Sequence, residues 1–222
     1  MTSPSYDWIA HHAAVRGDKL AVHDLDSGRT FTYSEMNERT SRLASALREA
    51  FSINRGDRVA VLAENDSNFF EVQFACWKLG AVFVPLNWRL SIPELEYIVG
   101  DADPDVIIHD DAFADNATKL AELCEIGHRI SWGSDTQEAA TYEEVLTSHE
   151  ALVGSESCTH DDILTIMYTS GTTGRPKGAI ITQGMTFWNA VNCVEYYGCA
   201  ESMINLAFLP LFHTGGLNVF AN

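Results

Sequence analysis

The sequence contains few basic residues. It has 14 lysines and arginines against 31 aspartates and glutamates, which gives a formal net charge of -17 at pH 7. Nucleic-acid backbones are polyanions that bind clustered Lys and Arg side chains, so this balance argues against a nucleic-acid partner. The acidic excess is instead typical of a chain whose surface charge keeps it in solution.

Long apolar runs are also missing. The longest apolar stretch, Met203 to Phe212, is interrupted by Asn205 and has about half the length that a membrane-spanning helix needs. The polar start, Met1 to Asp7, lacks the basic and apolar parts of a signal peptide. We therefore predict that the chain has no membrane span.

Paired cysteines and metal-ligand spacings are absent from the sequence as well. The five cysteines form an odd set without a Cys-x-x-Cys pair, which favours a reducing cytoplasm. The eight histidines are scattered, and the adjacent His11 and His12 point to different faces of the helix that we expect there. Among the histidines, His213 is the candidate functional residue.

The sequence does contain 46% apolar residues and a regular alternation of strand-like and helix-like segments. This alternation predicts an α/β fold in which largely parallel β-sheets are flanked by helices, in layers of the αβαβα type. An early β-hairpin is expected to pair residues 20–23 with residues 29–33 around the turn signal Asp26-Ser-Gly28. The strands after the hairpin are expected at residues 59–63, 81–86, 105–109, 130–132, 164–168, 178–181 and 204–209.

Start signals for helices stand in three places. Ser34 is expected to cap a helix that runs to about Ala50. The segments Ser91-Ile-Pro-Glu94 and Thr141-Tyr-Glu-Glu144 each place a hydroxyl three residues before a glutamate, which is the pattern of a capping box. The inward stripe of the helix that Ser34 is expected to cap should contain Met36, Leu43, Ala44 and Leu47. The polar stretch over residues 151–162 is expected to be a loop.

The most informative segment follows the apolar residues Ile163 to Met167. It reads Tyr168-Thr-Ser-Gly-Thr-Thr-Gly-Arg-Pro-Lys-Gly178. Its glycines allow several backbone N-H groups to turn toward one anion, while its hydroxyls and Lys177 add donors and a positive charge. Pro176 stiffens the backbone before the lysine. The segment therefore predicts a phosphate-binding loop that contains Thr169, Ser170, Gly171, Thr172, Thr173, Gly174 and Lys177.

This loop does not have the spacing of a Walker A loop, because Lys177 follows a proline and precedes a glycine. Residues 169–178 instead resemble the phosphate-binding signature of the adenylate-forming enzymes, which include acyl- and aryl-CoA ligases, peptide-synthetase adenylation domains and firefly-type luciferases. Three further segments agree with that family in its order: Phe31 to Met36, Trp77 to Asn87, and Phe208 to His213. The resemblance runs the length of the chain and is closest to the acyl-CoA ligases.

The resemblance implies a ligation in two steps. A carboxylate attacks the α-phosphorus of ATP to give an acyl adenylate and pyrophosphate, and the thiol of CoA then displaces AMP. By similarity, residues 169–173 and Lys177 hold the β- and γ-phosphates, and Lys177 stabilises the charge that develops there. Thr169 is expected to help coordinate Mg²⁺. The implied small-molecule substrate is a fatty or aromatic carboxylic acid.

His213 follows the expected strand at residues 204–209 and a Pro-Leu-Phe bend, in a region that lines the acyl pocket of the family. The resemblance makes His213 a catalytic candidate that contacts the substrate carboxylate or closes the pocket, and a helix-capping role is the alternative. Adenylation domains for amino acids usually carry an aspartate at this point, because the substrate ammonium needs a partner. His213 therefore favours a simple carboxylic acid over an amino acid.

Members of this family are more than twice as long as this chain, so the resemblance implies the N-terminal part of the large adenylation domain. Residues 1–160 are expected to form a first α/β subdomain, and residues 161–222 the phosphate loop and the start of the acyl-pocket subdomain. The family's adenine, ribose and later acidic Mg²⁺ contacts have no counterpart here. We therefore expect residues 1–222 alone to be inactive and to form homo-oligomers through an exposed apolar end. Two alternatives stay open: an amino-acid adenylation domain, and an inactive remnant that binds a nucleotide or a partner.

Overall fold

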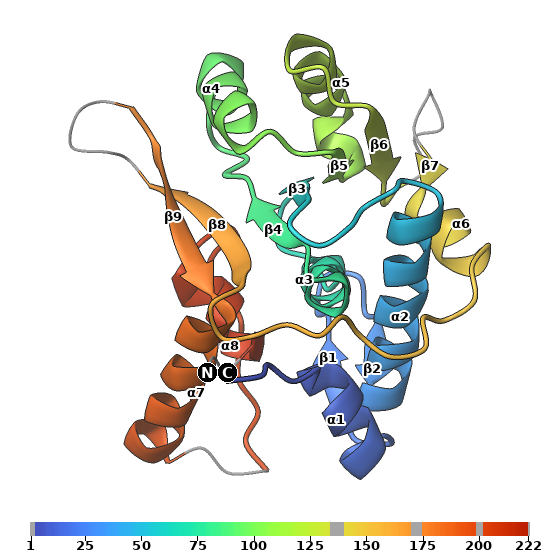
Figure 1. Ribbon diagram of the computed structural model, residues 1–222, viewed down its shortest axis with the longest axis vertical. Helices are drawn as coiled ribbons and strands as arrows, with labels where there is room; N and C mark the ends of the chain where they lie inside the picture. Colours follow the sequence, from blue (N-terminus) through green and yellow to red (C-terminus); the bar gives the residue numbers. More distant parts are fainter. Residues whose placement is uncertain (1–2, 134–139, 170–174, 199–201, 222) are drawn as a thin grey trace.

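The computed structural model describes residues 3–133, 140–169, 175–198 and 202–221, and a seven-stranded β-sheet forms its centre (Figure 1). The strands are β3 (Arg58–Leu62), β4 (Val82–Pro85), β5 (Val106–His109), β6 (His128–Ser131), β7 (Ala140–Thr141), β8 (Ile163–Thr169) and β9 (Lys177–Thr182). Their order across the sheet is β7-β6-β5-β3-β4-β8-β9. Neighbouring strands are parallel, except that β9 is antiparallel to β8. The predicted α/β fold with largely parallel strands is confirmed.

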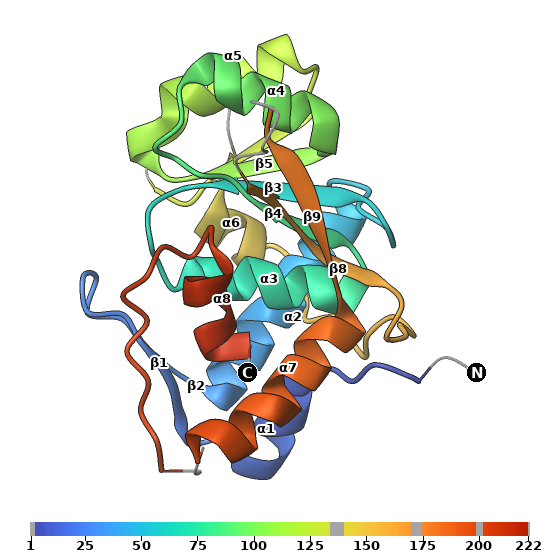
Figure 2. The ribbon, with the colours of Figure 1, turned by 90° about the vertical axis from the view of Figure 1, so that its left-hand side faces the viewer.

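Helices cover both faces of this sheet (Figure 1, Figure 2). They are α1 (Trp8–Arg16), α2 (Tyr33–Glu49), α3 (Asn68–Leu79), α4 (Ile92–Ala102), the 3-10 helix η1 (Asp111–Phe113), α5 (Ala114–Leu123), α6 (Tyr142–Thr147), α7 (Gln183–Tyr197) and α8 (Thr214–Ala221). α4 and α5 lie on one face, and α2, α3 and α6 lie on the other, with α1 packed against α2. Within the described residues, no helix is long and apolar enough to cross a membrane.

The central strand β3 shows how the two faces divide the core. Val59 and Val61 belong to one buried cluster with residues of α2 and α3, whereas Ala60 and Leu62 belong to a second cluster with residues of α4 and α5. All four side chains are fully buried. Because both faces are covered, the strand reads in sequence as a continuous apolar run, as parallel strands usually do.

α3 is a central helix, since every residue from Asn68 to Leu79 is buried. Its Glu71 carboxylate accepts hydrogen bonds from Arg39 Nε on α2 (2.7 Å) and from the Tyr142 hydroxyl on α6 (2.9 Å). Burial raises the pKa of Glu71, although the Arg39 guanidinium opposes that shift. Removal of one partner would leave a buried charge uncompensated, so this contact fixes how α2, α3 and α6 pack together.

The predicted early hairpin is confirmed by β1 (Leu20–His23) and β2 (Thr30–Thr32), which pair antiparallel. The helix after it begins earlier than predicted, because its N-cap is Thr32 and not Ser34. The Thr32 hydroxyl accepts a hydrogen bond from Glu35 N (3.2 Å), and the Glu35 carboxylate accepts one from Thr32 N (2.7 Å). Thr32 is the cap because the glutamate three residues later completes a capping box, which Ser34 cannot form.

The two other predicted helix starts are confirmed, and a complete capping box is present at Ser91 but not at Thr141. At the start of α4, the Glu94 carboxylate accepts hydrogen bonds from Ser91 N (2.9 Å) and from the Ser91 hydroxyl (2.6 Å). At the start of α6, the Thr141 hydroxyl donates to the Glu144 carboxylate. The predicted inward stripe of α2 is fully buried, at Met36, Leu43, Ala44 and Leu47.

The predicted strand at residues 204–209 is wrong. The segment 203–208 has no regular secondary structure, and Ile204 and Phe208 are 95% and 72% exposed. A strand needs a neighbour for its backbone N-H and C=O groups, and none of the described strands pairs with this segment. The sequence did not predict β7, which pairs with β6 at the edge of the sheet opposite β9. The loop over residues 151–162 is confirmed, and the subdomain division after residue 160 stays a prediction.

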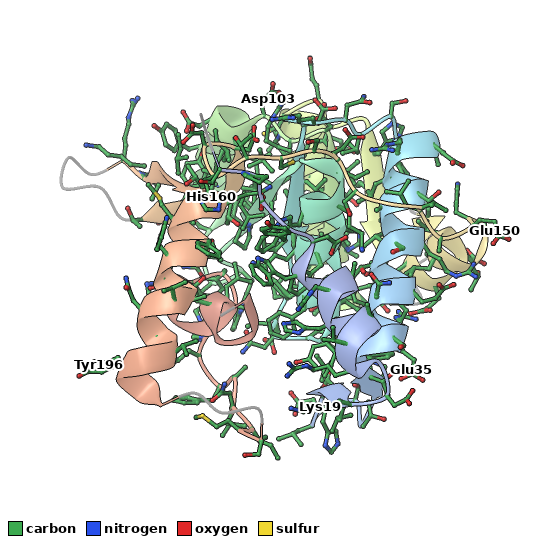
Figure 3. The ribbon with its side chains drawn as sticks, turned by 60° about the horizontal axis from the view of Figure 1, so that its bottom comes forward. Lys19, Glu35, Asp103, Glu150, His160 and Tyr196 are labelled. Carbon is green, nitrogen blue, oxygen red and sulfur yellow. The ribbon has the colours of Figure 1, made fainter. Side chains whose placement is uncertain are left out.

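α7 is attached to the molecule near its start. Gly184 N donates a hydrogen bond to the His160 carbonyl oxygen (2.9 Å), and the Phe187 ring stacks on Trp8 with 6.1 Å between ring centroids. Figure 3 shows His160 beside the first turn of the helix and Tyr196 projecting outward from its other end. α7 therefore joins the N-terminal segment at one end and faces solvent at the other.

Candidate functional site

The predicted phosphate loop connects the antiparallel strands β8 and β9. Thr169 ends β8, Lys177 begins β9, and the two residues are register partners across the hairpin. Such partners have Cβ atoms about 5 Å apart. Ser170, Gly171, Thr172, Thr173 and Gly174 lie outside the described residues. The structure thus places the hydroxyl and the ammonium at the two ends of the loop next to each other.

The alternation of side chains along β8 decides which way this pair points. Met167 belongs to the core cluster that contains α3, whereas Tyr168 packs against the cluster that contains α4. Residues two apart on a strand share a face, and so do register partners. Thr169 and Lys177 therefore lie on the α3 side of the hairpin. Both residues are exposed, so an incoming anion can reach them.

His213 immediately precedes α8 and is exposed. Its Nδ1 accepts a hydrogen bond from Gly215 N (3.2 Å), and its carbonyl oxygen accepts from Gly216 N and Leu217 N (3.0 Å each). The geometry of the helix-capping alternative is therefore present. Leu211 and Leu217, on either side of His213, are buried in the cluster that contains α3. His213 consequently lies on the same side of the sheet as Thr169 and Lys177.

Asn65 is a site residue that sequence reasoning missed. Its Nδ2 donates to the Leu209 carbonyl oxygen (2.9 Å), and its Oδ1 accepts from Leu211 N (2.9 Å). Asn65 thereby fixes the bend that leads to His213. The residue follows β3 at the edge where the parallel strands end, and α/β sheets bind their ligands at this edge. A polar side chain shortly after a buried apolar strand was the signal in the sequence.

The loop after β4 reaches the same bend. The Arg89 guanidinium carbon lies 4.9 Å from the ring centroid of Trp88 and 5.6 Å from that of Phe212. A cation over the face of an aromatic ring is a favourable contact. This contact joins the loop after β4 to the residue before His213, so the bend is held from two neighbouring strands.

The topological switch point of the parallel strands is a poor site for phosphate. β3 lies between β4 and β5, so the connection after β3 runs to one side of it and the connection after β4 crosses to the other side. Such a reversal of strand order often marks a ligand site. Two acidic residues meet there, and Glu64 N donates a hydrogen bond to Asp110 Oδ2 (3.2 Å). Burial raises the pKa of the Asp110 carboxyl. Carboxylates repel phosphate, so the anion site that the geometry favours is the β8–β9 hairpin.

The described residues of the site offer few oxygen ligands for a metal cation. Among the residues that the structure describes, no group of three or more His, Cys, Asp or Glu side chains could hold a metal ion. Mg²⁺ is commonly held by one or two protein oxygens together with substrate phosphates and water. The exposed Thr169 hydroxyl fits such a ligand, and its role in binding Mg²⁺ stays a prediction.

The hairpin, the loop and the bend before His213 all fall within one family match. The sequence model of the AMP-binding enzyme family matches residues 9–222. The chain belongs to this family. The match confirms the resemblance that residues 169–178 carry, and it extends from the second residue of α1 through α8.

Individual relatives agree with the family match. Feruloyl-CoA synthase from Amycolatopsis sp is 39% identical over 212 residues, which cover 96% of this chain and 40% of that protein. Indoleacetate–CoA ligase from Aromatoleum aromaticum is 35% identical over 213 residues, which cover 96% of this chain and 41% of that protein.

The fold of this member of the AMP-binding enzyme family is also found in solved structures. The o-succinylbenzoate CoA synthetase from Bacillus subtilis, in complex with its acyl-adenylate intermediate, matches with a TM-score of 0.83 at 29% identity. The match covers 98% of this chain and 42% of that one. The chain therefore spans about two fifths of the length of the relatives it matches.

Proposed function

We propose that this chain supplies the phosphate-binding loop of an enzyme that activates a carboxylic acid with ATP and transfers the acyl group to CoA. The observation that carries the proposal is the register pairing of Thr169 with Lys177 at the two ends of a Gly- and Thr-rich loop. The names of the relatives support the second step, because both feruloyl-CoA synthase and indoleacetate–CoA ligase form thioesters of CoA.

The chemistry explains why a hydroxyl and an ammonium belong at this place. Attack of a carboxylate on the α-phosphorus of ATP brings two anions together and leaves pyrophosphate, so the barrier is largely electrostatic. Lys177 would stabilise the charge that grows on the leaving pyrophosphate. The Thr169 hydroxyl would hold Mg²⁺, which neutralises phosphate charge when it is bound. Loop backbone N-H groups would add further donors.

His213 gives the proposal its substrate class. A histidine at the acyl pocket can approach a carboxylate but offers no fixed negative charge to an ammonium. We therefore propose a simple carboxylic acid, which disfavours the alternative of an amino-acid adenylation domain. The relatives feruloyl-CoA synthase, indoleacetate–CoA ligase and o-succinylbenzoate CoA synthetase all carry names of acids with an aromatic ring. An aromatic acid is accordingly the first choice, and a fatty acid is the second.

The test is acid-dependent exchange of pyrophosphate into ATP by the protein expressed from its complete reading frame, called the full-length protein below. The panel contains a cinnamic acid, indoleacetate, o-succinylbenzoate, a long-chain fatty acid, and the matched pair 3-phenylpropanoate and phenylalanine. This pair differs by one ammonium group. We expect exchange with aromatic acids and 3-phenylpropanoate but not with phenylalanine, followed by acyl-CoA formation when CoA is added.

Two results would contradict the proposal. Exchange with phenylalanine but not with 3-phenylpropanoate would indicate an amino-acid adenylation domain. The absence of exchange with every acid, by a protein that still binds MgATP, would indicate nucleotide binding without acid activation.

A further inference from the structure

Both ends of the phosphate loop contact the same helix, α4. Tyr168 stands directly before Thr169, and its hydroxyl donates a hydrogen bond to Asp101 Oδ2 (2.6 Å). Arg175, the first residue that the structure describes after residues 170–174, has its guanidinium carbon 5.7 Å from the ring centroid of Tyr97. Figure 1 and Figure 2 show the hairpin of β8 and β9 extending to the level of α4. A residue on each side of residues 170–174 thus contacts the helix.

The two contacts on α4 form one surface. Tyr97 and Asp101 are four residues apart, so they lie on the same face of the helix, one turn from each other. The helix itself is firmly packed, because Leu95, Ile98 and Val99 on its other side are buried in the cluster that contains β3. α4 therefore connects the loop to the rigid part of the sheet.

A glycine on β9 makes room for the Tyr168 ring. Gly178 is the register partner of Tyr168. A Cβ atom at position 178 would lie 2.8 Å from Cγ2 of Ile166 and 3.2 Å from Cζ of Tyr168. A side chain there would displace the ring, so Gly178 lets the tyrosine lie across the partner strand and reach Asp101. This is a structural reason for the glycine, separate from any contact with phosphate.

The surroundings of the Tyr168 hydroxyl keep it protonated as a donor. Burial of the side chain raises the pKa of Tyr168, and the adjacent Asp101 carboxylate raises it further. A hydroxyl that donates to a carboxylate forms a charge-assisted hydrogen bond, which is about twice as strong as a neutral one. The hydroxyl is therefore protonated at neutral pH and can act as the donor.

We propose that Tyr168, Asp101 and Tyr97 are positioning residues that hold the two ends of the phosphate loop, and with them Thr169 and Lys177, in the geometry that binds the phosphates of ATP. The proposal rests on the proposed function of the loop and adds residues of α4, which do not belong to the loop. The alternation of the strand explains how they act. Tyr168 is held on the α4 side, which directs its neighbour Thr169 and the partner Lys177 to the opposite side.

The experiment measures MgATP affinity by calorimetry and the separate KM values for ATP and acid, using the full-length protein. Tyr168→Phe removes the hydroxyl and keeps the ring, and we expect it to weaken MgATP binding by about tenfold, the loss of one charge-assisted hydrogen bond. The KM for ATP should rise by a similar factor while the KM for the acid stays unchanged. Tyr97→Leu should weaken MgATP binding by about threefold, because a cation–π contact at an exposed site is weaker.

Two further variants separate positioning from general destabilisation. Asp101→Asn retains an acceptor, and we expect a loss of about threefold, because a neutral acceptor gives about half the free energy of a charged one. Tyr142→Phe is the matched control, since it also removes a tyrosine hydroxyl from a carboxylate, that of Glu71. Tyr142 begins α6, which follows β7 at the edge of the sheet opposite β9. The control change should lower the stability and leave the affinity for MgATP unchanged.

A double variant tests whether Tyr168 and Asp101 act through one contact. Tyr168→Phe combined with Asp101→Ala should weaken MgATP binding about as much as either change alone, because both remove the same hydrogen bond. Losses that add up to about a hundredfold would overturn the proposal, and so would wild-type affinity in Tyr168→Phe. These binding results do not depend on the acid. If the MgATP affinity of the full-length protein depends on this contact but the protein activates no acid, the result would contradict the proposed function alone.

Discussion

Apolar residues are mostly buried in the parallel layers around β3, whereas many are exposed in the C-terminal part after β9. In α3 every residue is buried, and the Glu71 carboxylate is paired with the Arg39 guanidinium. In α7 a stripe of apolar side chains faces solvent, and we call it the α7 stripe. Its members are Met185, Trp188, Val191 and Val194, of which Trp188 is 58% exposed.

This difference in burial separates the core of the molecule from the hairpin that carries the predicted loop. The parallel layers bury both faces of their strands and account for the core clusters. The predicted phosphate loop lies on the hairpin beside them, and the segment after α7 exposes further apolar residues, including Phe208. Exposed apolar stripes of this kind mark surfaces that bind another protein segment. The parallel layers thus carry the hairpin, whereas the C-terminal part leaves many of its apolar side chains exposed.

The largest expected effect compares one substitution in the two regions. Phe69→Ala should lower the free energy of unfolding by about 3–5 kcal/mol, because the fully buried ring lies between Phe83 and Trp132 and its loss leaves a cavity. Phe208→Ala should change the stability by about 0.5 kcal/mol or less, since that side chain is 72% exposed. Urea unfolding followed by circular dichroism measures both. Equal losses in the two variants would mean that the comparison is wrong.

The next effect concerns function and not stability. Lys177→Ala should slow adenylation in the full-length protein by about 10²-fold, the scale of losing one preorganised donor to the transition state. Its free energy of unfolding should remain close to wild type because Lys177 is exposed. Lys119→Ala, which removes an exposed lysine from α5, is the matched control. Adenylation at the wild-type rate in Lys177→Ala would remove the lysine from the mechanism.

A smaller effect distinguishes the two roles of His213. His213→Ala should raise the KM for the acid by about fivefold, the value of one ordinary hydrogen bond, and leave the KM for ATP unchanged. Asparagine is also a good helix cap, so His213→Asn keeps an acceptor for Gly215 N. If the KM for the acid rises in both variants, the imidazole contacts the acid. If asparagine restores the wild-type KM, His213 serves as the cap of α8.

The smallest effect tests the α7 stripe. Trp188→Ser should change the free energy of unfolding of residues 1–222 by about 0.5 kcal/mol or less, since the side chain is largely exposed. It should nevertheless reduce self-association, which light scattering after size-exclusion chromatography measures. Leu123→Ser is the control, because Leu123 is 54% exposed on α5, outside the stripe. A decrease of the same size in both variants would show that the stripe has no special role.

Local signals in the sequence predicted much of the fold. The alternation of apolar segments predicted the parallel strands, and the Ser91–Glu94 spacing predicted the start of α4, since both depend on residues close in the chain. The first cap was placed two residues late because Thr32 and Ser34 are both suitable side chains. The glutamate three residues after Thr32 decided between them.

The failed strand at residues 204–209 has a different physical cause. Its apolar composition is typical of a strand, but β-structure requires hydrogen bonds to a neighbour that the local sequence does not specify. The same limit hid Asn65, whose partners Leu209 and Leu211 lie 144 and 146 residues further along the chain.

The sequence by itself determined the class of fold and the chemistry of the loop, because hydroxyls, glycines and a lysine at fixed spacing have the same properties wherever the chain places them. Only the tertiary structure decided that Thr169 and Lys177 are register partners, and that Tyr168 reaches Asp101 across 67 residues of sequence. The reason is that register and burial are set by contacts between distant segments, whose free energy exists only once the sheet has formed.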